Sequence, residues 1–463
     1  MSLLHYAGAL IVLLAITALG VYSGSRVKSP GDFASASRQA GSGIVAGSII
    51  GTLVGGAATI GTAQLAFVYG FSAWWFTLGS GLACLVLLFV YAKPVYESCV
   101  ATMPQILSRE YGRSVATTAM VLTSLGSFLS VVSQVLSSIA LITSVSALAP
   151  WLATVLTVIL MLAYVMFGGV WGAGMVGMAK TGLLCASIGL CGILAYTMNG
   201  GLLPALSVLP PERYLSLFAR GVAVDLGAGI SLILGVVTTQ AYLQAICAAK
   251  SLKTAKRSLY WSAVLIPLLG IPGIFVGLYM RIHAPEITPS NALPLFILEY
   301  LPPLVSGMVL ATLLISVVGT AAGVSLGLSA MFCQDIYRVY GNPLADDRRL
   351  LFVSRVSLAV ILIAAALVSS GNINSLILGW SFMSMGLRGS VAFGVLTTAL
   401  FLPGWIPRRY ALWSMLVGPI CILVGKGWIG NTIDPLFIGV AGSLAVLVVG
   451  FFSHKRHTGN GSG

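Results

Sequence analysis

Two cationic residues, Lys180 and Arg388, stand inside long apolar stretches of this chain. Lys180 is the only charged residue in 171-WGAGMVGMAKTGLLCASIGLCGILAYTMN-199. A helix of about 20 apolar residues crosses a bilayer, and a charge near its centre costs at least ~2.5 kcal/mol unless it is paired or hydrated. Residues kept at that cost serve ions, protons or solutes, so these two cations are the first candidates for a functional site.

Arg388 lies near the middle of 379-GWSFMSMGLRGSVAFGVL-396, where its side chain cannot easily reach the membrane surface. A guanidinium matches a carboxylate through two parallel hydrogen bonds. Three interpretations are open: contact with a solute or a gate, a structural pair with an acid such as Asp225, and attachment to backbone carbonyls at a helix break. The first of these favours a small solute that carries a carboxylate.

The composition is that of a membrane protein. Of the 463 residues, 58% are hydrophobic and 8% are charged, and the mean hydropathy is +1.01. Soluble domains carry about 25% charged residues. We therefore expect an all-α polytopic protein in a lipid bilayer, without an appended soluble domain. The predicted membrane spans, about 13 in number, are 4–23, 43–69, 72–91, 114–147, 152–167, 172–198, 223–247, 259–280, 304–331, 350–370, 373–400, 411–426 and 433–452.

The net charge of +13 follows this predicted topology. With the N-terminus outside and the C-terminus in the cytoplasm, most Lys and Arg residues fall in or beside cytoplasmic loops, as the positive-inside rule requires. The exceptions outside the cell are Arg213, Arg220, Arg281 and Lys426. The basicity is thus topogenic, and we expect a multi-pass protein of the plasma (cell inner) membrane with no nucleic-acid partner.

Two of the predicted spans are rich in Gly and Thr at their middles, 47-GSIIGTLVGGAATIGTAQLAF-67 and 227-GAGISLILGVVTTQAYLQA-245. Glycine costs about 1 kcal/mol inside a helix. Interrupted helices at matching places in two halves mark the solute site of transporters with inverted repeats. The two spans are the second and the seventh, the offset that a five-plus-five repeat predicts. Close helix packing through small residues is the alternative for Gly51, Gly55 and Gly56.

A row of polar residues follows one face of the fourth span. Its members are Ser124, Ser127, Ser130, Ser133, Gln134 and Ser137. A polar face in a buried helix either lines a water-filled cavity or binds neighbouring helices. We favour the cavity. The predicted solute-binding residues are Thr52, Gly55, Gly56, Thr59, Gln64, Ser130, Ser133, Gln134, Thr238, Thr239, Gln240 and Arg388.

Several segments resemble the sodium:solute symporter family, which has the LeuT-type fold of ten core helices in two inverted repeats. The segments are 51-GTLVGGAATIGTAQLAFVYGFSAWW-75, 103-MPQILSREYG-112, 168-GGVWGAGMVGMAK-180, 239-TQAYLQAICAAKSLKTAKR-257 and 320-TAAGVSLGLSAMFCQDIYR-338. The last two are the most specific. The resemblance implies an extra helix and loop at 1–42, repeats at 43–198 and 223–400, and two further helices with a short tail at 401–463.

The resemblance also implies where this chain departs from its relatives. In the family, sodium lies between the first and eighth core helices. Backbone carbonyls there correspond to Gly51 and Val54, and two adjacent hydroxyl residues correspond to Gly319 and Thr320, so one hydroxyl is missing. In the fifth core helix, the family's Thr-Asp pair and following Gln are replaced by Val176, Gly177 and Lys180. The segment 168–180 resembles the family's turn between the fourth and fifth core helices, so a turn is expected there.

These departures lead to a hypothesis for Lys180. Sodium needs hard oxygen ligands, and an ammonium about 4 Å away repels it by on the order of 4 kcal/mol at an effective dielectric of about 20. We expect the Lys180 ammonium to stand in for sodium and to hold the first and eighth core helices together. Lysine, unlike arginine, can lose its proton when buried, so proton linkage is also expected. The alternatives are an unrelated pairing and a lysine that snorkels roughly 12 Å to the cytoplasmic face.

The sequence therefore predicts a secondary active transporter of a small organic solute that works by alternating access. Sodium independence is the first expectation, and an ordinary sodium-coupled symporter is the alternative. A non-transporting membrane sensor is the alternative of another class. There is no phosphate-binding GxxxxGK[ST] loop, and the four His residues lie near chain ends or in loops. We expect no enzyme activity, no metal site and no cofactor beyond a coupling sodium ion or proton.

Overall fold

The computed structural model describes residues 2–24, 38, 40–98, 102–146, 148–201, 204, 207–342, 344–428 and 434–459. Within its helices, the side chains of 19–24, 165–176, 334, 335, 339, 340, 347, 426–428 and 454–459 are not described. Most of the predicted loop before the second span therefore lies outside the described residues, as do the side chains of Val176 and Asp335. All named elements of the described chain are helices.

The N-terminal half forms one extra helix and then the elements of the first predicted repeat. These are α1 (Leu3–Gly24), α3 (Ser42–Leu53), the π-helix η2 (Ala57–Gly61), α4 (Thr62–Tyr69), the 3-10 helix η3 (Gly70–Trp74), α5 (Trp75–Val86), the π-helix η4 (Leu87–Tyr91), α6 (Ala92–Glu97), α7 (Met103–Tyr111), α8 (Arg113–Val145) and α9 (Pro150–Met198).

The C-terminal half repeats the plan and adds two helices. Its elements are α11 (Pro211–Tyr214), α12 (Val222–Val237), α13 (Gln240–Ala248), α14 (Leu252–His283), η5 (Pro289–Asn291), α15 (Ala292–Tyr300), α16 (Pro303–Met331), the π-helix η6 (Phe332–Gly341), α17 (Asp347–Ser370), α18 (Ile377–Phe401), α19 (Arg408–Trp428) and α20 (Pro435–Gly459).

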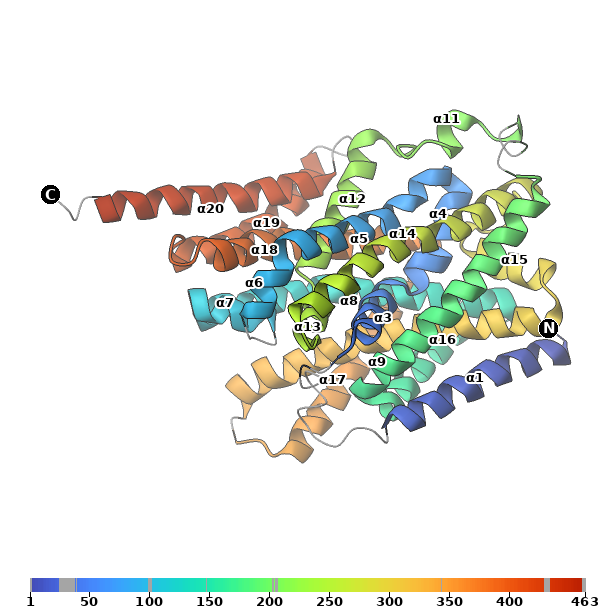
Figure 1. Cartoon of the computed structure of the whole chain (residues 1–463), viewed down its shortest axis with the longest axis horizontal. Coiled ribbons are helices and arrows are strands. Elements are labelled where there is room, and N and C mark those ends of the chain that lie inside the picture. Colours follow the sequence, from blue (N-terminus) through green and yellow to red (C-terminus); the bar gives the residue numbers. More distant parts are fainter. Residues whose placement is uncertain are drawn as a thin grey trace.

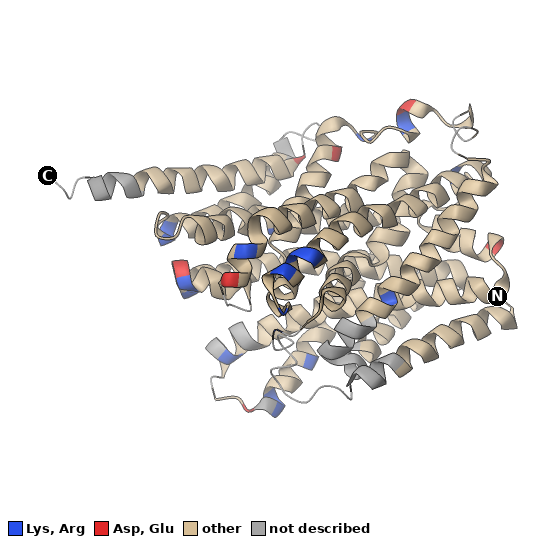
Figure 2. Cartoon of the chain, viewed as in Figure 1, with Lys and Arg blue, Asp and Glu red and all other residues tan. Residues whose placement is uncertain are grey.

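The long helices run side by side along one axis of the molecule, and the start of α1 and the end of α20 lie at opposite ends (Figure 1). Lys and Arg residues gather mainly at the end that holds α6, α7 and the start of α14 (Figure 2). This is the distribution that the positive-inside rule predicts for the cytoplasmic side. The orientation of the termini across the membrane stays a prediction.

Most of each predicted span is helical in the described part of the chain, although 43–69 and 223–247 are interrupted at their breaks. By length and composition, eight helices in the described part of the chain can cross a membrane, or nine if the bent pair α12–α13 counts as one span. The number is below thirteen partly because some predicted spans are short or broken into pieces. Helix α3, for example, has 12 residues and ends at a break, so it does not span a bilayer by itself.

The turn predicted at 168–180 is wrong at the level of the backbone. Helix α9 is continuous over 49 residues and contains both the fifth and the sixth predicted spans. The glycines of 168-GGVWGAGMVG-177 suggested an interruption. Glycine lowers helix propensity by about 1 kcal/mol but keeps its backbone N–H, whereas proline would remove it. The stretch has no proline, so a helix remains possible there.

Both predicted helix interruptions are confirmed. Helix α3 ends at Leu53, and Val54 leaves the helical region with φ −90° and ψ 82°. The π-helix η2 then begins at Ala57. In the second half, α12 and α13 meet at an angle of 48° across Thr238 and Thr239. The two breaks leave backbone groups without helical partners in the middle of the bundle, and those groups position the site described next.

Candidate functional site

Lys180 joins three helices in the core of the molecule. Its Nζ atom donates to the carbonyl oxygen of Gly51 at 3.1 Å, to that of Ser316 at 3.0 Å and to Thr320 Oγ1 at 2.8 Å. The side chain comes from α9, whereas its acceptors lie on α3 and α16. Only 5% of Lys180 is exposed. The structure thus brings Lys180, Gly51 and Thr320 together, as the sequence predicted.

This arrangement satisfies an ammonium completely. A lysine head group has three N–H donors, and each meets one oxygen. Gly51 is among the last four residues of α3, where carbonyls carry the partial negative charge of a helix C-terminus. Lys180 forms no ion pair in the described part of the structure. A monovalent cation is therefore held by neutral oxygens and a helix end, and the snorkelling alternative does not fit this buried position.

The break at the end of α3 explains why the Gly51 carbonyl is available. In an unbroken helix it would accept from the N–H of Gly55. The Gly55 N–H instead turns to the carbonyl of Leu53 at 3.2 Å. The Gly51 oxygen is left to Lys180 and, at 3.5 Å, to the Thr320 hydroxyl. A cation from another helix thus replaces a lost backbone hydrogen bond.

Ser316 is a site residue that the sequence analysis missed. Its carbonyl accepts from Lys180, and its hydroxyl donates to the Val54 carbonyl at 3.1 Å. The expectation that Val54 shares the cation with Gly51 is not met, because the three Nζ donors go to Gly51, Ser316 and Thr320. The signal was present, since Ser316 lies four residues before Thr320 and faces the same side of α16.

Gly319 contributes no oxygen, and a tyrosine lies where a side chain would begin. A Cβ atom built on Gly319 would be 3.1 Å from the Tyr164 hydroxyl and 3.3 Å from its Cζ atom. Contacts below 3.4 Å require the neighbour to shift. The Tyr164 ring therefore partly fills the position that carries a hydroxyl in the sodium:solute symporter family. Sequence reasoning did not find this contact, because Tyr164 of α9 and Gly319 of α16 are far apart in the chain.

Gln134 of α8 fixes the far side of the same break. Its Oε1 atom accepts from the backbone N–H of Gly56 at 2.8 Å. A Cβ on Gly55 would lie 2.8 Å from Gln134 Oε1, and one on Gly56 would lie 2.4 Å from Ser137 Cβ. These two glycines permit the close approach of α8 and α16 to the break. At Gly55 and Gly56, the two interpretations therefore hold together: the helix is interrupted there, and neighbouring helices pack closely against the interruption.

The remaining predicted solute-binding residues are mostly occupied with the protein itself. Thr52, Thr59 and Thr238 each donate to the carbonyl four residues earlier in the chain. Ser133 bonds Ser381 at 2.8 Å, and Ser130 is half-buried. The Gln64 side chain accepts from Ile377 N and donates to the Ser375 carbonyl at the start of α18. Gln240 accepts from Met103 N at 2.8 Å. The helix-binding alternative thus holds for Ser133.

Arg388 lies at the second helix break. Its Nη1 atom donates to Thr239 Oγ1 at 2.8 Å, and its Nη2 atom donates to Ser384 Oγ at 3.0 Å and contacts Met385 Sδ at 3.1 Å. Its Nε atom donates to the Ser384 carbonyl at 3.3 Å. The residue is 5% exposed. All these partners are neutral, so Arg388 has no acid partner among the described residues. Its contact at the α12–α13 break is to the Thr239 hydroxyl and not to a backbone carbonyl, and contact with a solute stays a prediction.

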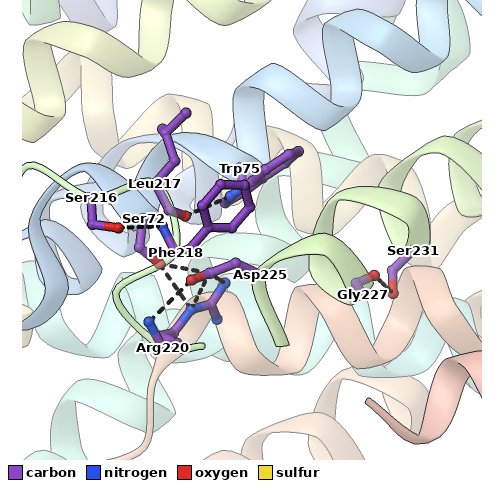
Figure 3. A network of polar contacts seen from close by, with 9 residues as sticks. All are labelled: Ser72, Trp75, Ser216, Leu217, Phe218, Arg220, Asp225, Gly227 and Ser231. Carbon is purple, nitrogen blue, oxygen red and sulfur yellow. Dashed lines mark hydrogen bonds and ion pairs between the residues drawn. The ribbon is translucent and has the colours of Figure 1, made fainter. Parts of the chain in front are cut away.

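Asp225 is not the partner of Arg388. It pairs with Arg220, whose Nη2 and Nε atoms lie 2.6 and 2.7 Å from Asp225 Oδ1. Ser72 donates to the same oxygen at 2.7 Å, and the Arg220 backbone N–H donates to Asp225 Oδ2 at 3.0 Å. Figure 3 shows these groups converging at the start of α12. Asp225 thus pairs with Arg220, which lies only five residues earlier in the chain, and not with the distant Arg388.

This Arg220–Asp225 cluster links several elements. The Arg220 guanidinium lies over the Phe382 ring of α18, with 5.2 Å between its Cζ and the ring centre. Asp434, just before α20, is close enough to interact electrostatically with Arg220. Burial raises the pKa of Asp434, while its hydrogen bond with the Leu436 N–H and the Arg220 charge oppose that shift. The cluster is thus a carboxylate-bound cation site, unlike the Lys180 site.

Comparison with known proteins supplies the family context. The model of the sodium:solute symporter family matches residues 33–418. The sodium/sialic acid symporter NanT of Aliivibrio fischeri is 22% identical, and the match covers 99% of this chain and 94% of the relative. The human high affinity choline transporter 1 is 24% identical, with 86% of this chain and 73% of the relative covered.

Solved structures agree on the fold. A Na⁺-coupled sialic acid symporter, solved in a substrate-bound outward-open state, has a TM-score of 0.79 at 18% identity, with 98% of both chains covered. The inward-facing conformation of Mhp1 has a TM-score of 0.58 at 13% identity, covering 94% of this chain and 95% of Mhp1. These likenesses confirm the expected LeuT-type helical architecture.

Proposed function

Because this chain belongs to the sodium:solute symporter family, we propose that it is a secondary transporter of a small organic solute whose fixed cation, Lys180, takes the place of a sodium ion. The observation that carries the proposal is the set of three hydrogen bonds from Lys180 Nζ to Gly51, Ser316 and Thr320. They join α3 to α16, the two elements between which sodium is expected in relatives.

The proposal assigns Lys180 the mechanical task of a coupling ion. A bound cation joins the broken first core helix to α16 while the carbonyls at the end of α3 supply negative potential. An ammonium on α9 performs the same joining without being able to diffuse away. A second cation beside it would meet on the order of 4 kcal/mol of repulsion at about 4 Å and an effective dielectric of about 20. Sodium independence follows.

Proton linkage is the finer part of the proposal. The three acceptors around Nζ require three donors and a positive charge for full satisfaction. A deprotonated amine offers only two donors, so loss of the proton would weaken the connection between α3 and α16. A lysine can alternate in this way, whereas an arginine stays charged. Lys180→Arg should therefore retain solute exchange but lose accumulation driven by a proton gradient.

A carboxylate-bearing solute would suit the charge of this region. Lys180 and Arg388 are both buried, and neither forms an ion pair within the described residues. An anionic group near the breaks of α3–η2 and α12–α13 would compensate them, because uncompensated buried charge is costly. The relatives named for sialic acid and choline widen the range of solutes to be tested.

The test is binding and transport of a solute panel in matched salts. Purified protein would be screened by thermal shift with sialic acid, proline, choline and short monocarboxylates, in sodium chloride and in N-methylglucamine chloride. Any hit would then be followed as counterflow into liposomes. Equal shifts and equal counterflow in both salts support the proposal. A response seen only with sodium would overturn it and identify an ordinary sodium symporter.

Two variants make the result specific for Lys180. Lys180→Met should abolish counterflow, whereas Lys250→Met, at an exposed lysine of the inner loop, should not change it. If the panel binds but no solute crosses the liposome membrane in the unaltered protein, the sensor alternative replaces transport. If Lys180→Met transports normally, the lysine does not serve as the ion.

A further inference from the structure

Arg388 occupies in the second repeat the place that Lys180 occupies in the first. Lys180 lies on α9, the fifth core helix of the first predicted repeat, and Arg388 lies on α18, its counterpart in the second. The broken helix α3–η2 corresponds to α12–α13, and α16 corresponds to α8. Lys180 connects α3 with α16, and Arg388 contacts the α12–α13 break on a helix that packs against α8.

The register of the two sites agrees residue by residue. In the first repeat, Gly51 faces the carbonyl of Gly177, where an added Cβ would lie 3.3 Å away. In the second, a Cβ on Gly235 would lie 2.6 Å from Met385 Cβ. Gly177 precedes Lys180 by three positions, and Met385 precedes Arg388 by three positions. A glycine at the helix break thus meets the cation's own helix one turn before the cation.

The carbonyls of Gly51 and Gly235 are also equivalent. Each lies among the last four residues of the helix before a break, and each would ordinarily accept from the N–H four residues later. The Gly55 N–H turns to Leu53, and the Thr239 N–H turns to Val236 at 3.1 Å. Both breaks therefore expose one carbonyl at the same position, and both exposed carbonyls point toward a cation site.

The two cations reach their carbonyls differently. Lys180 donates directly to the Gly51 oxygen. Arg388 donates to Thr239 Oγ1, which donates to the Gly235 oxygen at 2.5 Å. In the same way Arg388 donates to Ser384 Oγ, which donates to the carbonyl of Gly126 on α8 at 2.6 Å. Each hydroxyl accepts one hydrogen bond from the guanidinium and passes one on, so the donors and acceptors balance.

We propose that Arg388 is a second built-in cation, a positioning residue that ties the α12–α13 break to α8 through Thr239 and Ser384. The chain would then hold both of its broken helices with fixed cations at positions related by the internal repeat. Because the guanidinium donors are committed to the protein, a solute would sense the charge of Arg388 without needing a direct contact. The inference depends neither on the solute nor on the coupling ion.

Hydrogen–deuterium exchange on the purified full chain, without solute, tests this role at both breaks. Arg388→Gln and Thr239→Val should each speed exchange of the amides of 239–243 by about tenfold, because each removes a charge-assisted hydrogen bond that closes the break. Exchange over 50–57 should stay unchanged. Lys180→Met should give the reverse pattern: exchange should be faster over 50–57 and unchanged over 239–243.

Thr238→Val is the matched control. Its hydroxyl also donates to the Gly235 carbonyl, at 3.1 Å, but it does not contact Arg388, so its effect should be clearly smaller than that of Thr239→Val. Should Arg388→Gln fail to fold, Thr239→Val still decides, since it keeps the arginine. Equal exchange in Thr239→Val and Thr238→Val would overturn the proposal. So would an Arg388→Gln protein that exchanges normally and loses only the binding of anionic solutes.

Discussion

Two cations, the buried Lys180 and the partly buried Arg220, are held in opposite ways. Arg220 meets a fully buried carboxylate, Asp225, at 2.6 Å. Lys180 meets two carbonyls and one hydroxyl, with no acidic partner among the residues that the structure describes. A carboxylate neutralises its partner and makes a structural pair, whereas neutral oxygens at a helix end are the kind of ligand set that also suits a hard metal ion. If the proposal is right, the comparison separates a structural cation, Arg220, from a cation that substitutes for an ion, Lys180.

The largest expected effect comes from removing the ion substitute. Lys180→Met deletes three hydrogen bonds of a charged donor, each worth about 1.5–3 kcal/mol. Counterflow of the identified solute should fall by at least about 100-fold, measured in liposomes against Lys250→Met. Counterflow within a few fold of the unaltered protein would remove the distinction between the two cation sites.

Breaking the Arg220–Asp225 pair should lower the stability of the protein but should not make solute binding depend on sodium. Asp225→Ala leaves the guanidinium without its carboxylate, at a cost on the order of 2 kcal/mol, because Arg220 is partly exposed and can be rehydrated. A lower melting temperature is expected, measured against Glu212→Ala, an exposed acid before α12. Solute binding should stay independent of sodium. If it became sodium-dependent, the Arg220–Asp225 cluster would belong to the ion site.

A designed triple variant should create a sodium site in place of the Lys180 ammonium. Combining Lys180→Ala, Gly319→Ser and Tyr164→Phe removes the ammonium, restores a hydroxyl on α16 and clears the hydroxyl that faces Gly319. Solute binding should then rise by about tenfold with sodium, as measured by thermal shift in the two salts. The control is Lys180→Ala alone, which lacks the restored hydroxyl. Identical responses of the two proteins would show that position 319 has no part in the ion site.

Removing a single ligand of Lys180 should have a moderate effect. Thr320→Val deletes one of the three acceptors and leaves one N–H unsatisfied, for about 1–1.5 kcal/mol. Counterflow should therefore fall by roughly tenfold. Thr312→Val is a suitable control because the Thr312 hydroxyl donates only to the Met308 carbonyl of its own helix. Equal rates in the two variants would mean that the Thr320 hydroxyl is not needed to hold Lys180.

The smallest effect concerns the pH dependence of Asp434, which interacts with the Arg220–Asp225 cluster. Burial raises the pKa of Asp434 above its ordinary value of 3.8. The folded state therefore holds the proton more firmly than the unfolded state, so stability falls as pH rises through the range just above 3.8. Asp434→Asn should remove this part of the pH dependence, as seen in melting temperatures between about pH 4 and 6. If Asp434→Asn left the slope of melting temperature against pH unchanged, Asp434 would not be the source of this pH dependence.

Much of the fold could be predicted because membrane burial leaves a strong pattern. Apolar stretches indicated where most of the long helices lie, and the glycine-rich middles located both breaks. The continuous helix α9 could not be predicted, since glycine weakens a helix without preventing one. For the site, the buried cations were recognisable as isolated charges, but the hydroxyls of Ser316, Tyr164 and Ser384 were not. Serine, threonine and tyrosine are common in such helices, and only contacts between distant segments give them a role.

By itself, the sequence determined that the chain is a helical membrane protein of this family and that Lys180 and Arg388 require partners, because an isolated charge among apolar residues is costly wherever it lies. Which partners they have was decided only by the tertiary structure. Asp225 was a plausible match for Arg388 by charge, yet it pairs with Arg220, and Val54 was a plausible match for Lys180, yet it pairs with Ser316. Hydrogen bonds act over about 3 Å, so the packing of helices far apart in the sequence selects the partner.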